Sequence, residues 1–117
     1  MSNREVVITT EGRKLIARLS DNEAAHALAK MLPLHIQMRD HLRQEKTGEL
    51  PSPLPQAERQ RAFSAGTLGL WGDRDFVIYY RDGNVPAPGI VFLGQVEGDL
   101  SQLDNAAGLA ISVRHAD

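Results

Sequence analysis

Apolar and polar residues alternate with a period of two over most of this chain, which indicates β-strands. Residues 5–10, EVVITT, are rich in β-branched side chains, and residues 14–19 alternate after the turn-forming pair Glu11-Gly12. These two stretches are predicted to form a β-hairpin. The alternation returns over residues 34–40 and 109–114. The residues predicted to face the core in these strands are Leu15, Ala17, Leu19, Leu34, Ile36, Met38, Leu109, Ile111 and Val113.

One segment, Ser20 to Leu32, has helical spacing instead. Ser20 and Glu23 have the spacing of a capping box, and Asp21 and Asn22 are alternative caps. Pro33 disfavours helical geometry at the residue before it, so the helix is predicted to end at Leu32. The predicted apolar stripe consists of Ala24, Ala25, Leu28, Met31 and Leu32.

The stretch from Thr67 to Val96 is predicted to form three strands, and it holds the only Trp and both Tyr of the chain. Phe76, Ile78 and Tyr80 share one face of the middle strand, and Val77 and Tyr79 share the other. Gly94 lies within a strand pattern, as at a bulge or a close approach. In the third strand the alternation places Ile90, Phe92 and Val96 on one face and Val91, Leu93 and Gln95 on the other.

The remaining segments are predicted to be less regular. Residues 41–66 contain Gly48 and the run PSPLP at 51–55, and they indicate a long loop, either functional or mobile. Residues 99–103, DLSQL, indicate a short second helix. Most gaps between strands are too short for crossover helices, so antiparallel pairing is expected. The fold class that fits is mostly β: a closed or nearly closed antiparallel barrel, as one domain over residues 1–117.

Composition narrows the function classes. The formal net charge of −2 provides no basic field for nucleic acid or an anionic membrane. No Cys is present, which excludes disulfides and thiolate catalysis and fits a reducing compartment. Neither a secretory signal nor an apolar run of membrane-spanning length is visible, so a cytoplasmic location is expected.

Several short motifs have a characteristic order and spacing. They are Asp21-Asn22, Leu32-Pro33-Leu34, Asp40, Glu45-Lys46-x-Gly48-x-Leu50-Pro51, Gly69 to Gly72, Phe76 to Tyr80, and Gly89-Ile90-x-x-Leu93-Gly94-x-Val96. Together they resemble a prokaryotic cyclophilin-like family of uncharacterised proteins, from about Val6 to Leu103. The resemblance implies the cyclophilin architecture, an eight-stranded barrel capped by helices, with a substrate groove on the outside of the barrel.

The resemblance does not imply cyclophilin activity. True cyclophilins, which are peptidyl-prolyl isomerases, use an Arg preceded by Phe-His and a Phe followed by a Gln-Gly-Gly-type turn. This chain has neither; the nearest run is His35-Ile36-Gln37-Met38-Arg39. No catalytic residue is therefore assigned, because a fold alone does not carry a function.

Two rows of residues are candidates for a ligand site. His35, Gln37 and Arg39 project from one strand face, where Arg39 could hold a carbonyl or carboxylate through its planar fork; the alternative is an ordinary solvated face. The second row is an apolar outer face that needs cover from the helix, the long loop, a partner subunit or a ligand. It consists of Trp71, Val77, Tyr79, Val91 and Leu93.

A charged cluster, Asp40, Glu45, Lys46 and Glu49, precedes the Pro-rich segment. Its carboxylates could act in acid–base chemistry, and the alternative is a solvated loop with a structural salt bridge. No metal site is predicted, because His35 and His41 are about 20 Å apart along an extended strand. No phosphate-binding glycine motif or nucleophilic-serine motif is present, so no cofactor is predicted.

Three functions remain open. The first is a module that binds a small molecule or short peptide in an outer groove, through Arg39, Trp71 and Tyr79 with His35 and Glu45 nearby. The second is a prolyl isomerase-type enzyme with non-standard residues. The third is an interaction protein whose apolar strand face forms a homodimer. Neither a nucleic acid nor a membrane is expected as a partner.

Overall fold

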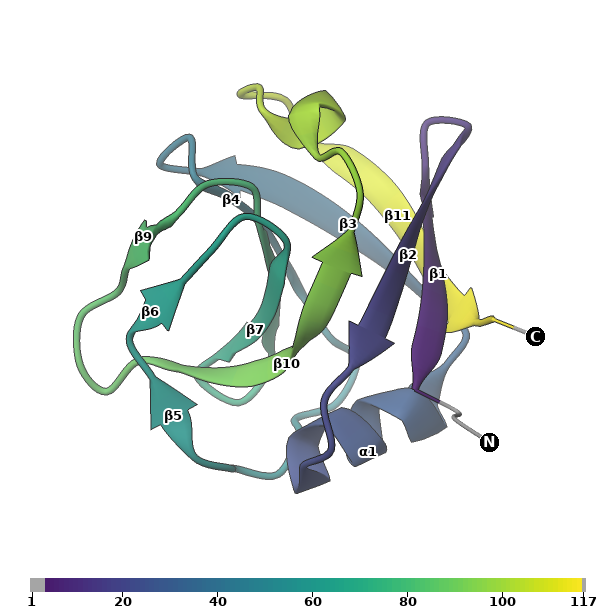
Figure 1. The fold of residues 1–117 in the computed structure, drawn as a ribbon. Coiled ribbons are helices and arrows are strands. Elements are labelled where there is room, and N and C mark those ends of the chain that lie inside the picture. The colour runs from purple at the N-terminus through teal and green to yellow at the C-terminus, as the bar shows by residue number, and fades with distance from the viewer. Residues whose placement is uncertain (1–3, 117) are drawn as a thin grey trace.

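The computed structural model describes residues 4–116 and is a closed antiparallel β-barrel (Figure 1). Eight strands form it, in the order β2-β1-β11-β3-β4-β8-β7-β10, and the pairing of β10 with β2 closes the ring. Their bounds are β1 Glu5–Thr10, β2 Arg13–Leu19, β3 Leu34–His41, β4 Glu45–Glu49, β7 Thr67–Trp71, β8 Asp75–Tyr79, β10 Ile90–Glu97 and β11 Leu109–His115. This confirms the predicted barrel.

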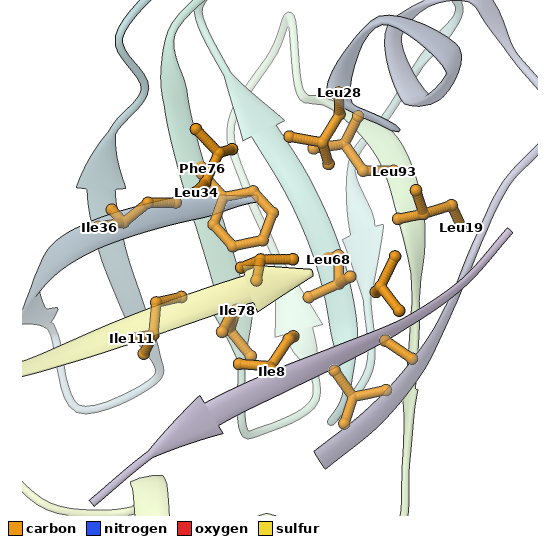
Figure 2. Packing of buried hydrophobic residues seen from close by; sticks show 14 of the residues in the cluster. Ile8, Leu19, Leu28, Leu34, Ile36, Leu68, Phe76, Ile78, Leu93 and Ile111 are labelled. Atoms are coloured by element: carbon orange, nitrogen blue, oxygen red, sulfur yellow. The ribbon is translucent and has the colours of Figure 1, made fainter. Parts of the chain in front are cut away.

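Alternate residues of the strands fill the barrel, as the pattern predicts (Figure 2). Ile8, Ile36, Leu68, Ile78 and Ile111 come from five different strands and are at most 3% exposed. A buried apolar side chain of this size contributes about 1.5–3 kcal/mol to folding, so this interior is the main source of stability.

One helix, α1 (Glu23–Met31), covers an end of the barrel through Ala24, Ala25 and Leu28 (Figures 1 and 2). It is shorter than predicted, because Asn22 is the cap: its Oδ1 accepts a hydrogen bond from the Ala25 N–H. Ser20 caps nothing, since its hydroxyl donates to the Phe92 carbonyl. The predicted second helix is a single 3₁₀ turn, η1 (Ser101–Leu103). Neither helix of residues 4–116 has the length and apolarity to cross a membrane.

The faces predicted for β10 are wrong in its first half. Val91 and Leu93 lie in the barrel interior, whereas Ile90 packs on the outside. The register against β7 shifts between Phe92 and Gly94. This is the bulge that Gly94 indicates, and an extra residue in a strand exchanges its two faces. Strict alternation across the bulge therefore assigned the first residues to the wrong side.

The prediction of a long loop over residues 41–66 is also wrong in part. It contains β4, which pairs with both β3 and β8, and the short strands β5 (Arg59–Gln60) and β6 (Ala62–Phe63). β4 has the sequence EKTGE, and four of its five residues are buried although none is apolar. Its strand character comes from its two neighbours in the barrel, which the local sequence does not contain.

A small outer sheet covers part of the barrel. β6 pairs with β9 (Gly83–Asn84), and the two carry Phe63 and the adjacent Val85 over the outer face of β8. The Phe63 ring stacks on the Tyr79 ring with centroids 3.8 Å apart. Val77 and Tyr79, predicted to face outward and to need cover, are covered by this chain itself. We call the segments 59–66 and 83–89 the flap.

Candidate functional site

A pocket of about 450 Å³ lies on the outer face of the barrel, between the flap and the β3–β4 turn. The flap supplies Asn84, Val85 and Pro86, and the turn region supplies His41, Leu42 and Gln44. Its floor consists of outward residues of β3, β4, β7 and β8. A volume of this size is typical of pockets that hold small organic ligands.

The strand register fixes the floor as three rows. One row places His41, Glu45 and Tyr79 side by side, and the next places Arg39, Thr47 and Val77 side by side. A third row runs from Glu49 through Asp75 to Trp71. Directly opposite residues of neighbouring strands lie about 5 Å apart, so side chains from all three rows reach one small volume.

Four of the five predicted ligand residues line this pocket: Arg39, Glu45, Trp71 and Tyr79. His35 does not. It lies four residues before Arg39 on β3, about 13 Å away along the strand, where β3 pairs with β11 instead of β4. There it borders a separate surface hollow together with Gln37 and Ser112.

Several lining residues were not predicted as ligand residues, notably Leu42, Asp75 and Val85. Asp75 shares the outward face of β8 with Val77 and Tyr79, so the alternation of that strand could have found it. Leu42 is 74% exposed and Trp71 36% exposed, both large apolar side chains at the pocket. Leu42 has a φ of 58°, a turn geometry that the sequence does not reveal.

Glu45 has an unusual environment for a carboxylate, since the residue is only 7% exposed. Its Oε1 accepts a hydrogen bond of 2.7 Å from the Gln44 amide. Burial raises the pKa of Glu45, and the Gln44 hydrogen bond opposes that effect only in part. Burial also raises the pKa of the neighbouring Tyr79 phenol, with a smaller contribution from the Glu45 charge. The pocket therefore holds a carboxyl group whose ionisation is penalised.

Arg39, unlike Glu45, is a charged residue of the pocket that is open to solvent. Its side chain is exposed, and within residues 4–116 it forms no ion pair or hydrogen bond. A guanidinium without a protein partner presents its donors to whatever enters the pocket.

Lys46 and Asp40, from the predicted charged cluster, face the opposite side of the sheet from Glu45. Lys46 is fully buried, and its Nζ lies 3.1 Å from Asp40 Oδ1, 2.6 Å from the Ala107 carbonyl and 2.8 Å from the Asn105 carbonyl. The expectation of a solvated loop is therefore wrong here, although a salt bridge is present. Glu49 is exposed, 3.9 Å from Arg74.

Histidines are scattered in the described part of the chain. His26 lies 2.6 Å from Asp21, and His115 lies 2.9 Å from the Ala29 carbonyl. No group of three or more His, Asp or Glu residues within residues 4–116 is arranged to hold a metal ion.

Comparisons with known proteins place the chain in a family. It is similar to the solution structure of a hypothetical protein from Archaeoglobus fulgidus, with a TM-score of 0.76 and 15% sequence identity over 97% of this chain and 95% of that one. At that identity the similarity concerns the fold alone. No curated protein sequence matches the chain. The model of the cyclophilin-like family matches residues 8–114, and the chain therefore belongs to the cyclophilin-like family.

Proposed function

We propose that this protein binds a small molecule or a short peptide in the outer pocket. The observation that carries the proposal is the convergence of Arg39, Glu45, Trp71 and Tyr79, from four strands, on one hollow of about 450 Å³. Concave sites with apolar walls and a few convergent polar groups are the usual form of ligand pockets.

Each wall has a distinct role in this function. Trp71 and Leu42 supply exposed apolar surface at the rim, which a ligand covers on binding. Arg39 supplies a planar pair of donors for a carbonyl or carboxylate. Glu45 supplies a buried acceptor on the floor. The flap closes the site on one side, held by the contact between Phe63 and Tyr79.

The single tryptophan makes the proposal testable without a known ligand. Trp71 is the only Trp in the chain, so its indole N–H resonance and its fluorescence report on this pocket alone. A library of small aromatic carboxylates and capped tripeptides is screened by ligand-observed NMR. Compounds that bind are expected to shift the Trp71 resonance and to lose about tenfold or more in affinity in Arg39→Ala and Trp71→Ala.

Arg114→Ala, an exposed arginine on β11, is the matched control and should leave the affinity unchanged. The site assignment would be wrong if the compounds that bind do not shift the Trp71 resonance and have the same affinity for Arg39→Ala and Trp71→Ala as for the wild-type protein.

A prolyl isomerase-type activity is the second candidate. The observation that favours it is the position of the pocket on the outside of the barrel, where the cyclophilin groove lies. The absence of the Phe-His-Arg and Gln-Gly-Gly runs speaks against it. A proline-isomer assay with a proline-containing tetrapeptide separates the two, because a rate at background excludes the enzyme and leaves the binding module.

Homodimerisation through the outer apolar face is not favoured, because the residues of that face are already buried within the chain. Val77 and Tyr79 are at most 1% exposed, under Phe63, Val85 and Ile90 of the same chain. Size-exclusion chromatography with light scattering tests this directly, and a monomer is the expected result.

A further inference from the structure

The outer pocket contains charges of both signs that do not neutralise each other. Arg39 lies opposite Thr47 on the β3–β4 ladder, which makes Glu45 its diagonal neighbour. Diagonal neighbours are about 7–8 Å apart at Cα, a separation that long side chains can bridge. Even so, no ion pair joins Arg39 to Glu45 or to Asp75 in the described structure.

We propose that the pocket recognises a small zwitterion, an α-amino acid with an apolar side chain, whose carboxylate binds Arg39 and whose ammonium group binds Glu45. The inference rests on the proposed function of the same pocket and deepens it by naming the ligand class. The basis of the proposal is that Arg39, which is exposed, and Glu45, which is buried, are diagonal neighbours on adjacent strands.

Charge complementarity favours this ligand over the alternatives. A purely anionic ligand would satisfy Arg39 and would bring a like charge towards Glu45 and Asp75. A neutral ligand without a donor for Glu45 would seal a buried carboxylate away from water with the Gln44 side-chain amide as its one donor within residues 4–116, which is costly for a full charge. A ligand ammonium group supplies a charged donor in addition to Gln44, and it offsets the effect of burial on the pKa of Glu45.

The rest of the pocket fits the side chain of such a ligand. Trp71 and Leu42 provide the exposed apolar surface, and Val85 and Pro86 extend it along the flap. Trp71 is the cross-strand partner of Asp75, and Tyr79 that of Glu45. Trp71 is exposed, so its ring is available to an organic cation near Asp75, whereas the Tyr79 ring is covered by Phe63. The volume of about 450 Å³ admits an amino acid as large as phenylalanine.

Three probes of nearly equal size separate the two charges. L-phenylalanine has both, L-phenylalaninamide lacks the carboxylate, and N-acetyl-L-phenylalanine lacks the ammonium group. Isothermal titration calorimetry on the wild-type protein gives the three dissociation constants, with Trp71 fluorescence as the check on location. L-phenylalanine is expected to bind at least about tenfold more tightly than either derivative, because each derivative leaves one charged group unpaired.

Two variants assign each preference to its residue. Arg39→Ala is expected to bind L-phenylalanine and its amide equally, and Glu45→Gln is expected to bind L-phenylalanine and its N-acetyl derivative equally. Arg114→Ala and Glu97→Gln, both exposed and away from the pocket, should keep the wild-type order of the three probes. The wild-type comparison needs no variant, so it holds even where a substitution impairs folding.

Equal affinities of the wild-type protein for all three probes would overturn the inference, as would no binding of L-phenylalanine at millimolar concentration. Retention of both preferences in the two pocket variants would overturn it as well. These failures differ from failure of the proposed function. If the pocket binds no ligand at all, no compound of the NMR library shifts the Trp71 resonance either. If only the ligand class is wrong, some compounds of that library still shift the Trp71 resonance.

Discussion

The ammonium group of Lys46 lies 3.1 Å from Asp40 Oδ1 inside one end of the barrel. Lys46 is fully buried and the Asp40 side chain is 9% exposed. Tyr80 donates its hydroxyl hydrogen to the same Asp40 oxygen, and the Asn105 and Ala107 carbonyls accept from Lys46. The pair thus ties β3 and β4 to the segment after η1. A buried pair stabilises only while both partners are present, because each charge depends on the other for solvation.

Lys46→Ala is therefore expected to lower the free energy of unfolding by about 3–5 kcal/mol. Lys46→Met keeps most of the volume and should cost less, because Asp40 retains the Tyr80 hydroxyl and the Arg43 N–H as donors. Denaturant unfolding measures both. Lys14→Ala, at an exposed position on β2, should change stability by no more than about 0.5 kcal/mol. A loss below about 1 kcal/mol for Lys46→Ala would contradict the structural role of the pair.

Part of the free energy of unfolding should depend on the ionisation of Asp40 and decrease in acid. Burial acts to raise the pKa of Asp40, but the hydrogen bonds from Tyr80 and Lys46 outweigh it and hold the pKa below its usual range. A carboxyl with a depressed folded-state pKa stabilises the fold above its unfolded pKa, about 3.9. That stability is lost as the pH falls through the folded pKa.

The measurement compares unfolding free energies of wild-type protein and Asp40→Asn from pH 7 down to pH 3. Wild-type protein is expected to be more stable than Asp40→Asn at neutral pH, and the difference between their unfolding free energies should decrease below about pH 4. A gap that stays constant over the whole range would show that the charge of Asp40 contributes nothing.

The ionisation of Glu45 should have the opposite effect on stability from that of Asp40. Because burial raises its pKa, its charged form destabilises the folded state. Glu45→Gln is expected to raise stability at pH 7, by roughly 0.5–2 kcal/mol, because the substitution removes a buried charge. The gain should shrink as the pH falls and vanish below about 4.3, the usual Glu pKa, where Glu45 is protonated in both states. Glu49→Gln, an exposed position on the same strand face, should stay within about 0.5 kcal/mol at pH 7. A Glu45→Gln protein no more stable than wild type would contradict the cost of burying this charge.

Two glycines of the barrel wall should differ in their tolerance of a methyl group. A Cβ on Gly94 would lie 2.5 Å from the Arg18 carbonyl oxygen and 2.9 Å from the Leu19 Cα, which are backbone atoms of the closing strand β2. A Cβ on Gly69 would lie 2.9 Å from the Ile90 Cδ1, the end of a flexible side chain. Gly94→Ala is therefore expected to cost about 1–3 kcal/mol and Gly69→Ala less. Equal thermal unfolding midpoints for the two variants would contradict this ranking.

The flap should be separable from the barrel. Phe63→Ala removes the ring that stacks on Tyr79 and is expected to speed amide hydrogen exchange in residues 59–66 and 83–89, with the barrel strands protected as before. Phe76→Ala, in the barrel interior, should lower protection across all strands, because deletion of a buried Phe side chain costs about 3–5 kcal/mol. Uniform acceleration in Phe63→Ala would mean that flap and barrel unfold together.

Local sequence predicts the parts of this fold that depend on local chemistry. The β1–β2 hairpin, α1 and the inward residues of β3, β8 and β11 follow from periodicity and turn residues. β4 does not, because Lys46 and Thr47 are buried by partners distant in sequence. The faces of β10 fail at one bulge. For the pocket, outward parity predicts Arg39 and Tyr79, which line it. The same parity also predicts His35, which lies where β3 pairs with β11 instead of β4 and is outside the lining.

The alternation along β8 has a consequence for how this protein can change. Phe76 and Ile78 hold the barrel, and Asp75, Val77 and Tyr79 shape the outer face from the same strand. A substitution at Asp75 can therefore change the lining of the outer pocket with little effect on the barrel interior, whereas substitutions at Phe76 and Ile78 act on stability. Tyr79 is the exception on the outer face, because it also holds the flap through Phe63. A combinatorial library that varies position 75 while keeping 76, 78 and 79 would therefore change the pocket lining on an intact scaffold.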